Sequence, residues 1–271
     1  MHKVSFIGGG NMAAAIIGGL IASGAQPVDI EVVETNADAR GQLAARFGVE
    51  THADLAQARL HGLIVLAVKP QSLPEVAAGL ATRLSTQLVV SIAAGVRVAD
   101  LSRWLGGHSR VVRAMPNTPA LVQAGIAGLY APAAVNQDAR SQAEMVLRAV
   151  GGVVWVESET QLDAVTAVSG SGPAYVFYCI ESLEAAAVAQ GLSPATARQL
   201  ALQTFFGAAK LALESGEEPA LLRSRVTSKG GTTERGIAAL EAAALKPAFA
   251  QAVDAASRRS AELGDELGRL A

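Results

Sequence analysis

Two glycine-rich stretches carry the residue types and spacings that could do chemistry in this chain. The first is residues 8–13, Gly-Gly-Gly-Asn-Met-Ala, which directly follows the short apolar run Val4–Ile7. A buried strand, a tight glycine turn and a helix together form the G-x-G-x-x-A variant of the dinucleotide-binding fingerprint. The start of the chain is therefore predicted to hold the pyrophosphate of a dinucleotide.

Each position of this fingerprint has a physical role. Gly8 lets the chain turn sharply, and Gly10 lacks a Cβ, so that a pyrophosphate can approach the backbone. Ala13 lets the helix pack closely on the strand, and the free N–H groups of the first helical turn point at the phosphates. A glycine turn without a ligand is the alternative. A secretory signal peptide is disfavoured, because the glycines interrupt the continuous apolar core that such a peptide needs.

The second stretch is residues 227–233, Thr-Ser-Lys-Gly-Gly-Thr-Thr, which lies between two helical segments. It gathers backbone N–H groups and hydroxyls just before a helix, an arrangement that suits a carboxylate. The spacing and the Gly-Lys-Ser/Thr order of a phosphate-binding P-loop are missing. A capped turn between helices, without a ligand, is the alternative.

The side chains that are missing from these stretches narrow the chemistry. None of the histidines follows a predicted strand end as a catalytic base should; they are His2, His52, His61 and His108. Alcohol oxidation needs a general base, for which Lys210 is a candidate. Hydroxyacid dehydrogenases with a helix lysine carry Asn three residues later, however, where this chain has Leu213.

Reduction of a cyclic imine fits this inventory better. A protonated iminium carbon accepts hydride without a strong acid from the protein, so that orientation, a carboxylate anchor and one hydroxyl at the nitrogen are sufficient. No cluster of His, Cys, Asp and Glu has the spacing of a metal site in the sequence.

Composition bounds the class of protein. The 271 residues are 51% hydrophobic and 17% charged, which predicts a large core and some surface covered by a partner. The net charge of −2, without blocks of one sign, gives no indication of nucleic-acid binding. No run is long and apolar enough to predict a membrane span. Cys179 is the single cysteine, which excludes an intrachain disulfide and favours a cytoplasmic protein.

Apolar runs alternate with helical patterns over residues 1–158. After the first strand, further strands are predicted at Asp29–Val33, Leu63–Val68, Leu88–Ile92, Val111–Ala114, Ile126–Tyr130 and Val153–Glu157. Helices are predicted at about Asn11–Ser23 and Ala139–Ala149, and a capping box at residues 72–75 begins another. This alternation is typical of a doubly wound, mostly parallel Rossmann sheet. Ligands bind such sheets at the carboxyl edge of the strands.

The end of the second predicted strand bears on cofactor choice. Glu34 and Thr35 follow it, where an adenosine ribose would lie. A carboxylate there suits the 2′-hydroxyl of NAD and repels the 2′-phosphate of NADP, although Arg40 could soften that repulsion. A solvated strand end is the alternative role for Glu34.

Residues 159–271 contain helical patterns and no further predicted strand. The helices are expected at about 162–190, with an interruption at 169–173, and at 194–216, 219–224, 233–244 and 247–267. Several are apolar on more than one face, which predicts burial in a subunit interface. About 110 residues are too few to cover this surface alone, which favours an intertwined homodimer.

Taken together, the motifs resemble those of the pyrroline-5-carboxylate reductase family over nearly the whole chain. The most specific are Ser-Gly-Ser-Gly-Pro-Ala-Tyr at 169–175 and Ser-Lys-Gly-Gly-Thr-Thr at 228–233; others are Ala-Val-Lys-Pro at 67–70, Ala-Ala-Gly at 93–95 and Met-Pro-Asn-Thr-Pro at 115–119. The resemblance implies reduction of 1-pyrroline-5-carboxylate to L-proline by NAD(P)H, the last step of proline synthesis. It also implies a helical dimer domain that often assembles into larger rings.

The resemblance also assigns site residues. The cofactor would contact Ile7, Gly8, Gly10, Asn11, Met12, Glu34, Thr35, Ala67, Val68, Lys69, Pro70, Ala93, Ala94, Gly95 and Asn117, the last near the nicotinamide. The substrate would contact Ser228, Gly230, Gly231, Thr232 and Thr233, with the Thr233 hydroxyl directed at the ring nitrogen as the catalytic group. Part of this loop would come from the partner subunit. Many relatives carry Arg or Ser where this chain has Thr35, so the sequence favours NADH or use of both cofactors.

Two other functions remain open from the residues alone. One is a reductase or dehydrogenase of another small imino or hydroxy acid, with Lys210 as the catalytic base. The other is a dinucleotide-binding sensor without enzymatic activity, whose helical half, residues 159–271, binds a protein.

Overall fold

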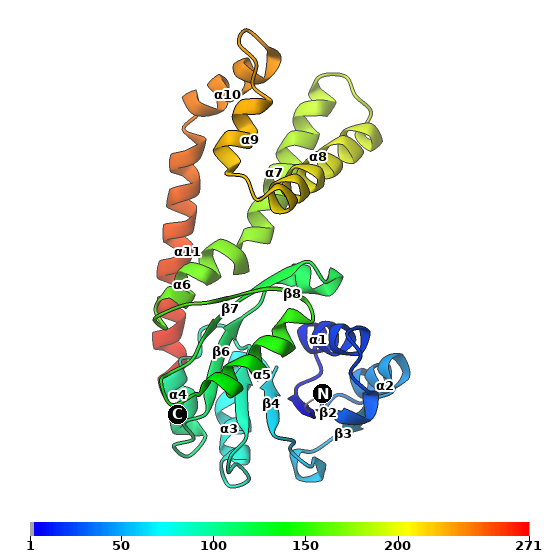
Figure 1. Ribbon diagram of the computed structural model, residues 1–271, viewed down its shortest axis with the longest axis vertical. Coiled ribbons are helices and arrows are strands. Elements are labelled where there is room, and N and C mark those ends of the chain that lie inside the picture. Colours follow the sequence, from blue (N-terminus) through cyan, green and yellow to red (C-terminus); the bar gives the residue numbers. More distant parts are fainter. Residues whose placement is uncertain (1–2, 271) are drawn as a thin grey trace. The chain divides into compact units, whose positions relative to one another are not determined.

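The computed structural model describes residues 3–270, and its first half is built on an eight-stranded sheet (Figure 1). The strand order is β3-β2-β1-β4-β5-β6-β7-β8, and every pair is parallel except β6 with β7. The strands are β1 (Val4–Ile7), β2 (Ile30–Val33), β3 (Glu50–His52), β4 (Leu63–Leu66), β5 (Leu88–Ser91), β6 (Val111–Met115), β7 (Gly125–Tyr130) and β8 (Gly151–Trp155). The predicted mostly parallel sheet is confirmed.

Helices cover both faces of this sheet, which is why its central strands are apolar throughout. One face packs against α1 (Asn11–Ala22), α2 (Ala37–Phe47) and α5 (Gln137–Arg148). The other packs against α3 (Leu73–Ala81) and α4 (Val98–Trp104). Strands β1, β2, β4 and β5 are buried along their full length. Short 3₁₀ turns lie at Pro27–Asp29 (η1), Leu55–Gln57 (η2), Pro70–Ser72 (η3) and Thr118–Val122 (η4).

The structure adds one strand and removes one predicted cap. Strand β3 is not among the predicted strands, because all three of its side chains are polar and give no apolar run. It makes His52 the last residue of a strand. The predicted capping box is wrong: Ser72 caps α3 without a side-chain hydrogen bond, since the preceding turn η3 already holds the chain there.

The helical half contains no strand among its described residues. Its elements are α6 (Gln161–Val165), the π-helical turn η5 (Thr166–Gly170), α7 (Gly172–Ala189), α8 (Pro194–Ser215), α9 (Pro219–Arg225), α10 (Thr232–Ala242) and α11 (Leu245–Leu267). The interruption predicted at 169–173 is this π-helical turn. The helix predicted to stop at Gly216 does so, with Gly216 in the left-handed conformation at φ 63°. None of the helices in residues 3–270 is long and apolar enough to cross a membrane.

Contacts divide the chain into two compact units. The first comprises the chain up to Ser171 together with the segment from Asp254 onward, and the second is Gly172–Val253. The last turns of α11 therefore pack with the Rossmann sheet, where Leu267 joins the buried cluster of α3 and α4. The boundaries between these compact units differ from the predicted domain boundary between residues 158 and 159. The predicted division of labour between a dinucleotide-binding and a helical domain remains a prediction about function.

Candidate functional site

A cleft of about 700 Å³ opens where strands β1, β2, β3 and β4 end. Most of the predicted cofactor contacts that follow β1, β2 and β4 line it: Ile7, Gly8, Gly10, Glu34, Thr35, Ala67, Val68 and Lys69. Three further stretches line it that the sequence did not indicate, at Ala53–Leu55, Ser72 and residues 75–79 on α3. The carboxyl ends of parallel strands meet at one edge of the sheet, so they form this cleft together.

The glycine turn at the head of α1 has the shape that a pyrophosphate requires. Gly8 has a φ of 99°, and a Cβ there would lie 2.7 Å from the carbonyl atoms of Ala67. A Cβ on Gly10 would meet nothing within 4 Å, so the space beside it is open. Gly10 is the N-cap of α1 and provides no side-chain cap, which leaves the first N–H groups available to an anion. The residues present therefore fit a dinucleotide.

Glu34 ties this turn to the end of β2. Its carboxylate accepts the Gly9 N–H at 2.8 Å through one oxygen and the Asn36 N–H at 2.8 Å through the other. Arg40 donates from Nη1 to the carbonyl oxygens of Glu34 and Thr35, both at 2.8 Å. The carboxylate thus has a structural partner on each oxygen, beyond any ribose contact that it makes.

The Ala93–Gly95 loop follows β5 and is held by the end of α11. Gly95 has a φ of 79°, and a Cβ there would come within 3.0 Å of Leu267. Arg97, two residues on, pairs with Asp265 at 2.7 Å and donates to the carbonyl oxygen of Ala261 at 3.2 Å. None of these contacts had a signal in the sequence, since α11 lies more than 150 residues further along the chain.

Asn117 joins two loops with its side chain. Its Nδ2 donates to the Ser169 carbonyl oxygen at 3.1 Å, and its Oδ1 accepts the Ile126 N–H at 2.9 Å. Only 8% of Asn117 is exposed. Ser169 lies in the π-helical turn, and π-helical turns are frequent at functional sites. Asn117 therefore fixes the position of this turn, whatever contact it makes with a nicotinamide.

The second glycine stretch lies in the second compact unit, before α10. Gly230 has a φ of 74°, and its N–H donates to the carboxylate of Glu234 at 2.7 Å. Helix α10 starts at Thr232 with Gly231 as its N-cap and no side-chain cap. Ser228 and Thr233 are both exposed. The loop presents its hydroxyls and helix N-terminus to solvent, as an anion-binding loop requires.

Lys210 has an ordinary environment. It lies exposed on α8, with its Nζ 3.7 Å from a carboxylate oxygen of Glu214 one turn later. Pairs of this kind on a helix surface are common and weak. Within residues 3–270, no group of three or more His, Cys, Asp and Glu side chains is arranged to hold a metal ion.

Comparison with known proteins finds a family match in each half of the chain. Residues 159–263 match the family described as pyrroline-5-carboxylate reductase dimerisation, and residues 3–95 match the family described as NADP oxidoreductase, coenzyme F420-dependent. Pyrroline-5-carboxylate reductase of Pseudomonas aeruginosa is 47% identical to this chain, with 98% of both proteins covered. The chain belongs to the pyrroline-5-carboxylate reductase family.

Solved structures agree with this assignment. A pyrroline-5-carboxylate reductase from Coxiella burnetii superposes with a TM-score of 0.94 and 45% identity, covering 97% of this chain and 98% of that one. A pyrroline carboxylate reductase from Plasmodium falciparum with NADP bound gives a TM-score of 0.84 at 29% identity, covering 97% and 98%. The fold class and the family predicted from the sequence are therefore confirmed.

Proposed function

We propose that this protein reduces 1-pyrroline-5-carboxylate to L-proline, the final step of proline biosynthesis, by hydride transfer from NAD(P)H. The observation that carries this proposal is the 47% identity to a pyrroline-5-carboxylate reductase over 98% of the chain. The glycine turn and the exposed loop at 228–233 supply the two anion-binding features that a dinucleotide and a small carboxylate need.

The chain's own residues bind and orient the cofactor. The pyrophosphate binds beside Gly8 and Gly10 at the N-terminus of α1, where the first helical turn, with Asn11 and Met12, presents its N–H groups. Ala67–Pro70 and Ala93–Gly95 border the rest of the cofactor, and Asn117 lies towards the nicotinamide. When bound, NAD(P)H supplies the hydride. Choice between NADH and NADPH rests with Glu34 and Thr35, which favour NADH or use of both.

The substrate is held by the loop before α10. Ser228 and Gly230–Thr233 surround its carboxylate, which accepts from hydroxyls and from the backbone N–H groups of Thr232 and Thr233. The N–H groups of Gly230 and Gly231 already donate to Glu234 and to the Ser228 carbonyl oxygen, and so they shape the loop. The Thr233 hydroxyl hydrogen-bonds to the ring nitrogen and orients the imine carbon towards the nicotinamide face. Because a protonated imine already accepts hydride, orientation replaces a strong acid.

Assembly completes the enzyme. We infer a homodimer through residues 159–271, with part of the substrate loop serving the partner, and dimers grouped into a larger ring. Several large apolar side chains of the second unit are exposed in the single chain, including Phe177, Phe206 and Leu213. The proposed compartment is the cytoplasm, and the proposed ligands are small molecules, with neither nucleic acid nor membrane among them.

The test is a steady-state assay of the purified protein. Oxidation of NADPH or NADH should depend on added 1-pyrroline-5-carboxylate and should yield proline in equal amount. Comparing kcat/KM for the two cofactors then measures the preference set at Glu34 and Thr35. Tight cofactor binding without turnover of this substrate would contradict the proposal.

A further inference from the structure

A charged side chain lies fully buried inside the Rossmann sheet. Glu31, in the middle of β2, has no exposed surface, and it faces Ser5 across the β1–β2 pair. Its Oε1 accepts the Ser5 hydroxyl at 2.5 Å. A buried carboxylate is stable only when its oxygens are hydrogen-bonded. The partners of Glu31 therefore indicate what it does.

Two of these partners are successive backbone N–H groups of the segment between β3 and β4. Arg59 donates to Oε2 at 3.0 Å and Leu60 donates to Oε1 at 2.8 Å. Leu60 has a φ of 55°, a left-handed conformation that a leucine rarely adopts. The pair of N–H groups forms an anion-binding nest, and Glu31 supplies the anion from within the protein. Next along, His61 donates its N–H to the Ser5 hydroxyl oxygen at 2.7 Å.

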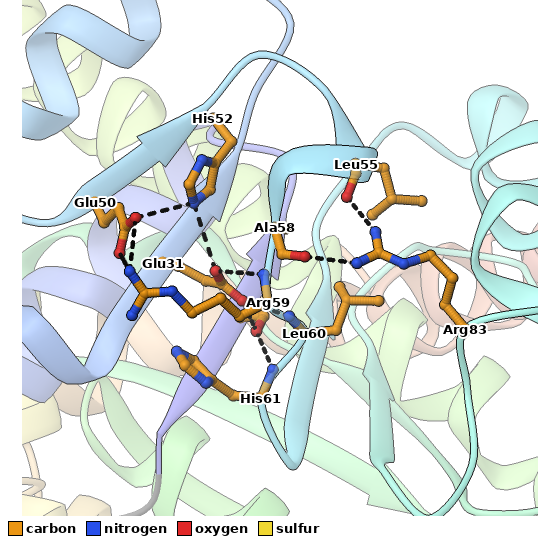
Figure 2. Close-up of polar contacts among 10 residues, drawn as sticks. Glu31, Glu50, His52, Leu55, Ala58, Arg59, Leu60, His61 and Arg83 are labelled. Atoms are coloured by element: carbon orange, nitrogen blue, oxygen red, sulfur yellow. Dashed lines mark hydrogen bonds and ion pairs between the residues drawn. The ribbon is translucent and has the colours of Figure 1, made fainter.

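Hydrogen bonds are the main reason why the pKa of this buried carboxylate is low. Burial by itself raises the pKa of Glu31, but hydrogen bonds from Ser5 and from the Arg59 N–H, with the charge of His61, lower it below its usual value. His52 on β3 lies with its Nε2 3.5 Å from Oε2 of Glu31 and 3.6 Å from Glu50. The Arg59 side chain points instead to Glu50, at 3.0 Å (Figure 2).

A second set of hydrogen bonds, in addition to those to Glu31, holds the segment between β3 and β4. The Arg83 guanidinium, which follows α3, donates to the carbonyl oxygens of Leu55 and Ala58 (Figure 2). The Arg83 contacts bracket the 3₁₀ turn η2, and the Glu31 contacts begin at the next residue, Arg59. Its first residues, Ala53–Leu55, line the cofactor cleft.

We propose that Glu31 is a positioning residue for the cofactor: it holds the Arg59–His61 backbone so that Ala53–Leu55 forms the wall of the cleft on the adenosine side. Strand β3 is the outermost strand, next to β2, whose end at Glu34 faces the adenosine ribose. The wall therefore contacts the adenosine half of NAD(P)H, and the nicotinamide half lies beyond its reach. This inference rests on the proposed function only in taking NAD(P)H as the ligand of the cleft.

The test replaces Glu31 with its isosteric amide. In Glu31→Gln the side-chain NH₂ faces N–H and O–H donors, so one or more of these hydrogen bonds is lost. We expect the Kd of NADPH, measured by fluorescence titration, and its KM to rise about tenfold, while kcat stays within about twofold. With reduced nicotinamide mononucleotide, which lacks the adenosine half, kcat/KM should stay at the wild-type value.

A matched control lies in the same cluster. Glu50→Gln removes a carboxylate that contacts the Arg59 side chain and His52 but none of the backbone N–H groups that Glu31 holds, and it should leave the Kd of NADPH within about twofold. Ser5→Ala keeps the Glu31 charge but removes two hydrogen bonds, the one to Glu31 and the one from the His61 N–H, and should raise the Kd in the same direction by about threefold. If Glu31→Gln fails to fold, the Kd of NADPH in Ser5→Ala tests the proposal instead.

Two results would overturn the proposal. One is an unchanged Kd for NADPH in the folded Glu31→Gln or Ser5→Ala variant. The other is an equal loss of kcat/KM with NADPH and with the mononucleotide, which indicates general damage to the fold. Failure of the proposed reaction is separable, because a wild-type protein that binds NADPH without reducing 1-pyrroline-5-carboxylate still gives the Kd comparison.

Discussion

The cofactor cleft and the loop at 227–233 are both glycine-rich anion sites, but they are built to different degrees within one chain. The cleft lies on strands with fully buried residues, and its glycine turn is fixed by hydrogen bonds to Glu34 and to the Val33 carbonyl oxygen. The loop is exposed, and Glu234 in the first turn of its own helix accepts the Gly230 N–H. The comparison indicates that the cleft is preorganised by its own subunit, and we propose that assembly and substrate complete the loop.

The strongest way to break the preorganised site is to add a Cβ at Gly8. Gly8→Ala places a methyl group 2.7 Å from the Ala67 backbone at a φ of 99°, where an L side chain is also strained. We expect the Kd of NADPH to rise by about a hundredfold or more, with a lowered melting temperature. Fluorescence titration and thermal unfolding measure both. Gly10→Ala, whose added Cβ meets open space, is the matched control for strain and should preserve the melting temperature.

A substitution in the loop at 227–233 should lower kcat and leave cofactor binding unchanged. Thr233→Ala removes the hydroxyl that we propose to bind the ring nitrogen and is expected to lower kcat about a hundredfold, while the Kd of NADPH stays near the wild-type value. The exposed position of Thr233 makes a folding defect unexpected. An unchanged kcat would remove Thr233 from the mechanism.

Mixing these two variants sharpens the comparison further. If the loop of one subunit serves the cleft of its partner, a mixed dimer of Gly8→Ala and Thr233→Ala subunits contains one intact site. Refolding the two variants together should then restore activity that neither shows alone. Inactive mixed dimers would show that each loop serves its own subunit.

A smaller effect is expected where α11 supports the cleft. Arg97→Ala removes the 2.7 Å pair with Asp265 and the bond to the Ala261 carbonyl oxygen, loosening the Ala93–Gly95 loop. Because the Arg97 and Asp265 side chains are partly exposed, we expect the KM of NADPH to rise about threefold to fivefold with little change in kcat. A KM equal to the wild-type value would show that the loop needs no support from α11.

The smallest effect should come from Lys210. Its exposed pair with Glu214 contributes little, so Lys210→Ala should keep kcat, KM and melting temperature near wild type. A loss of kcat by more than about tenfold would instead favour the dehydrogenase with a lysine base.

Much of the fold could be predicted from local patterns. The glycine turn, the apolar runs of β1, β4 and β5 and the stop of α8 at Gly216 each carry their signal within a few residues. Strand β3 could not be predicted in this way, because its three residues are polar and become a strand only by pairing with β2. The predicted capping box at Ser72 is wrong because Ser72 is the last residue of the 3₁₀ turn η3, and its side chain makes no cap hydrogen bond to α3.

The sequence by itself determined the glycine turn, the alternation of strands and helices and the hydroxyl-rich loop, because each depends on backbone geometry and periodicity over short distances. Only the tertiary structure decided that Glu31 is buried against the Arg59 and Leu60 N–H groups, that Glu34 holds Gly9, and that α11 reaches the Ala93–Gly95 loop. These contacts join residues that are far apart in the chain. Their energy depends on burial and on the direction of each hydrogen bond, which exist only once the sheet has formed.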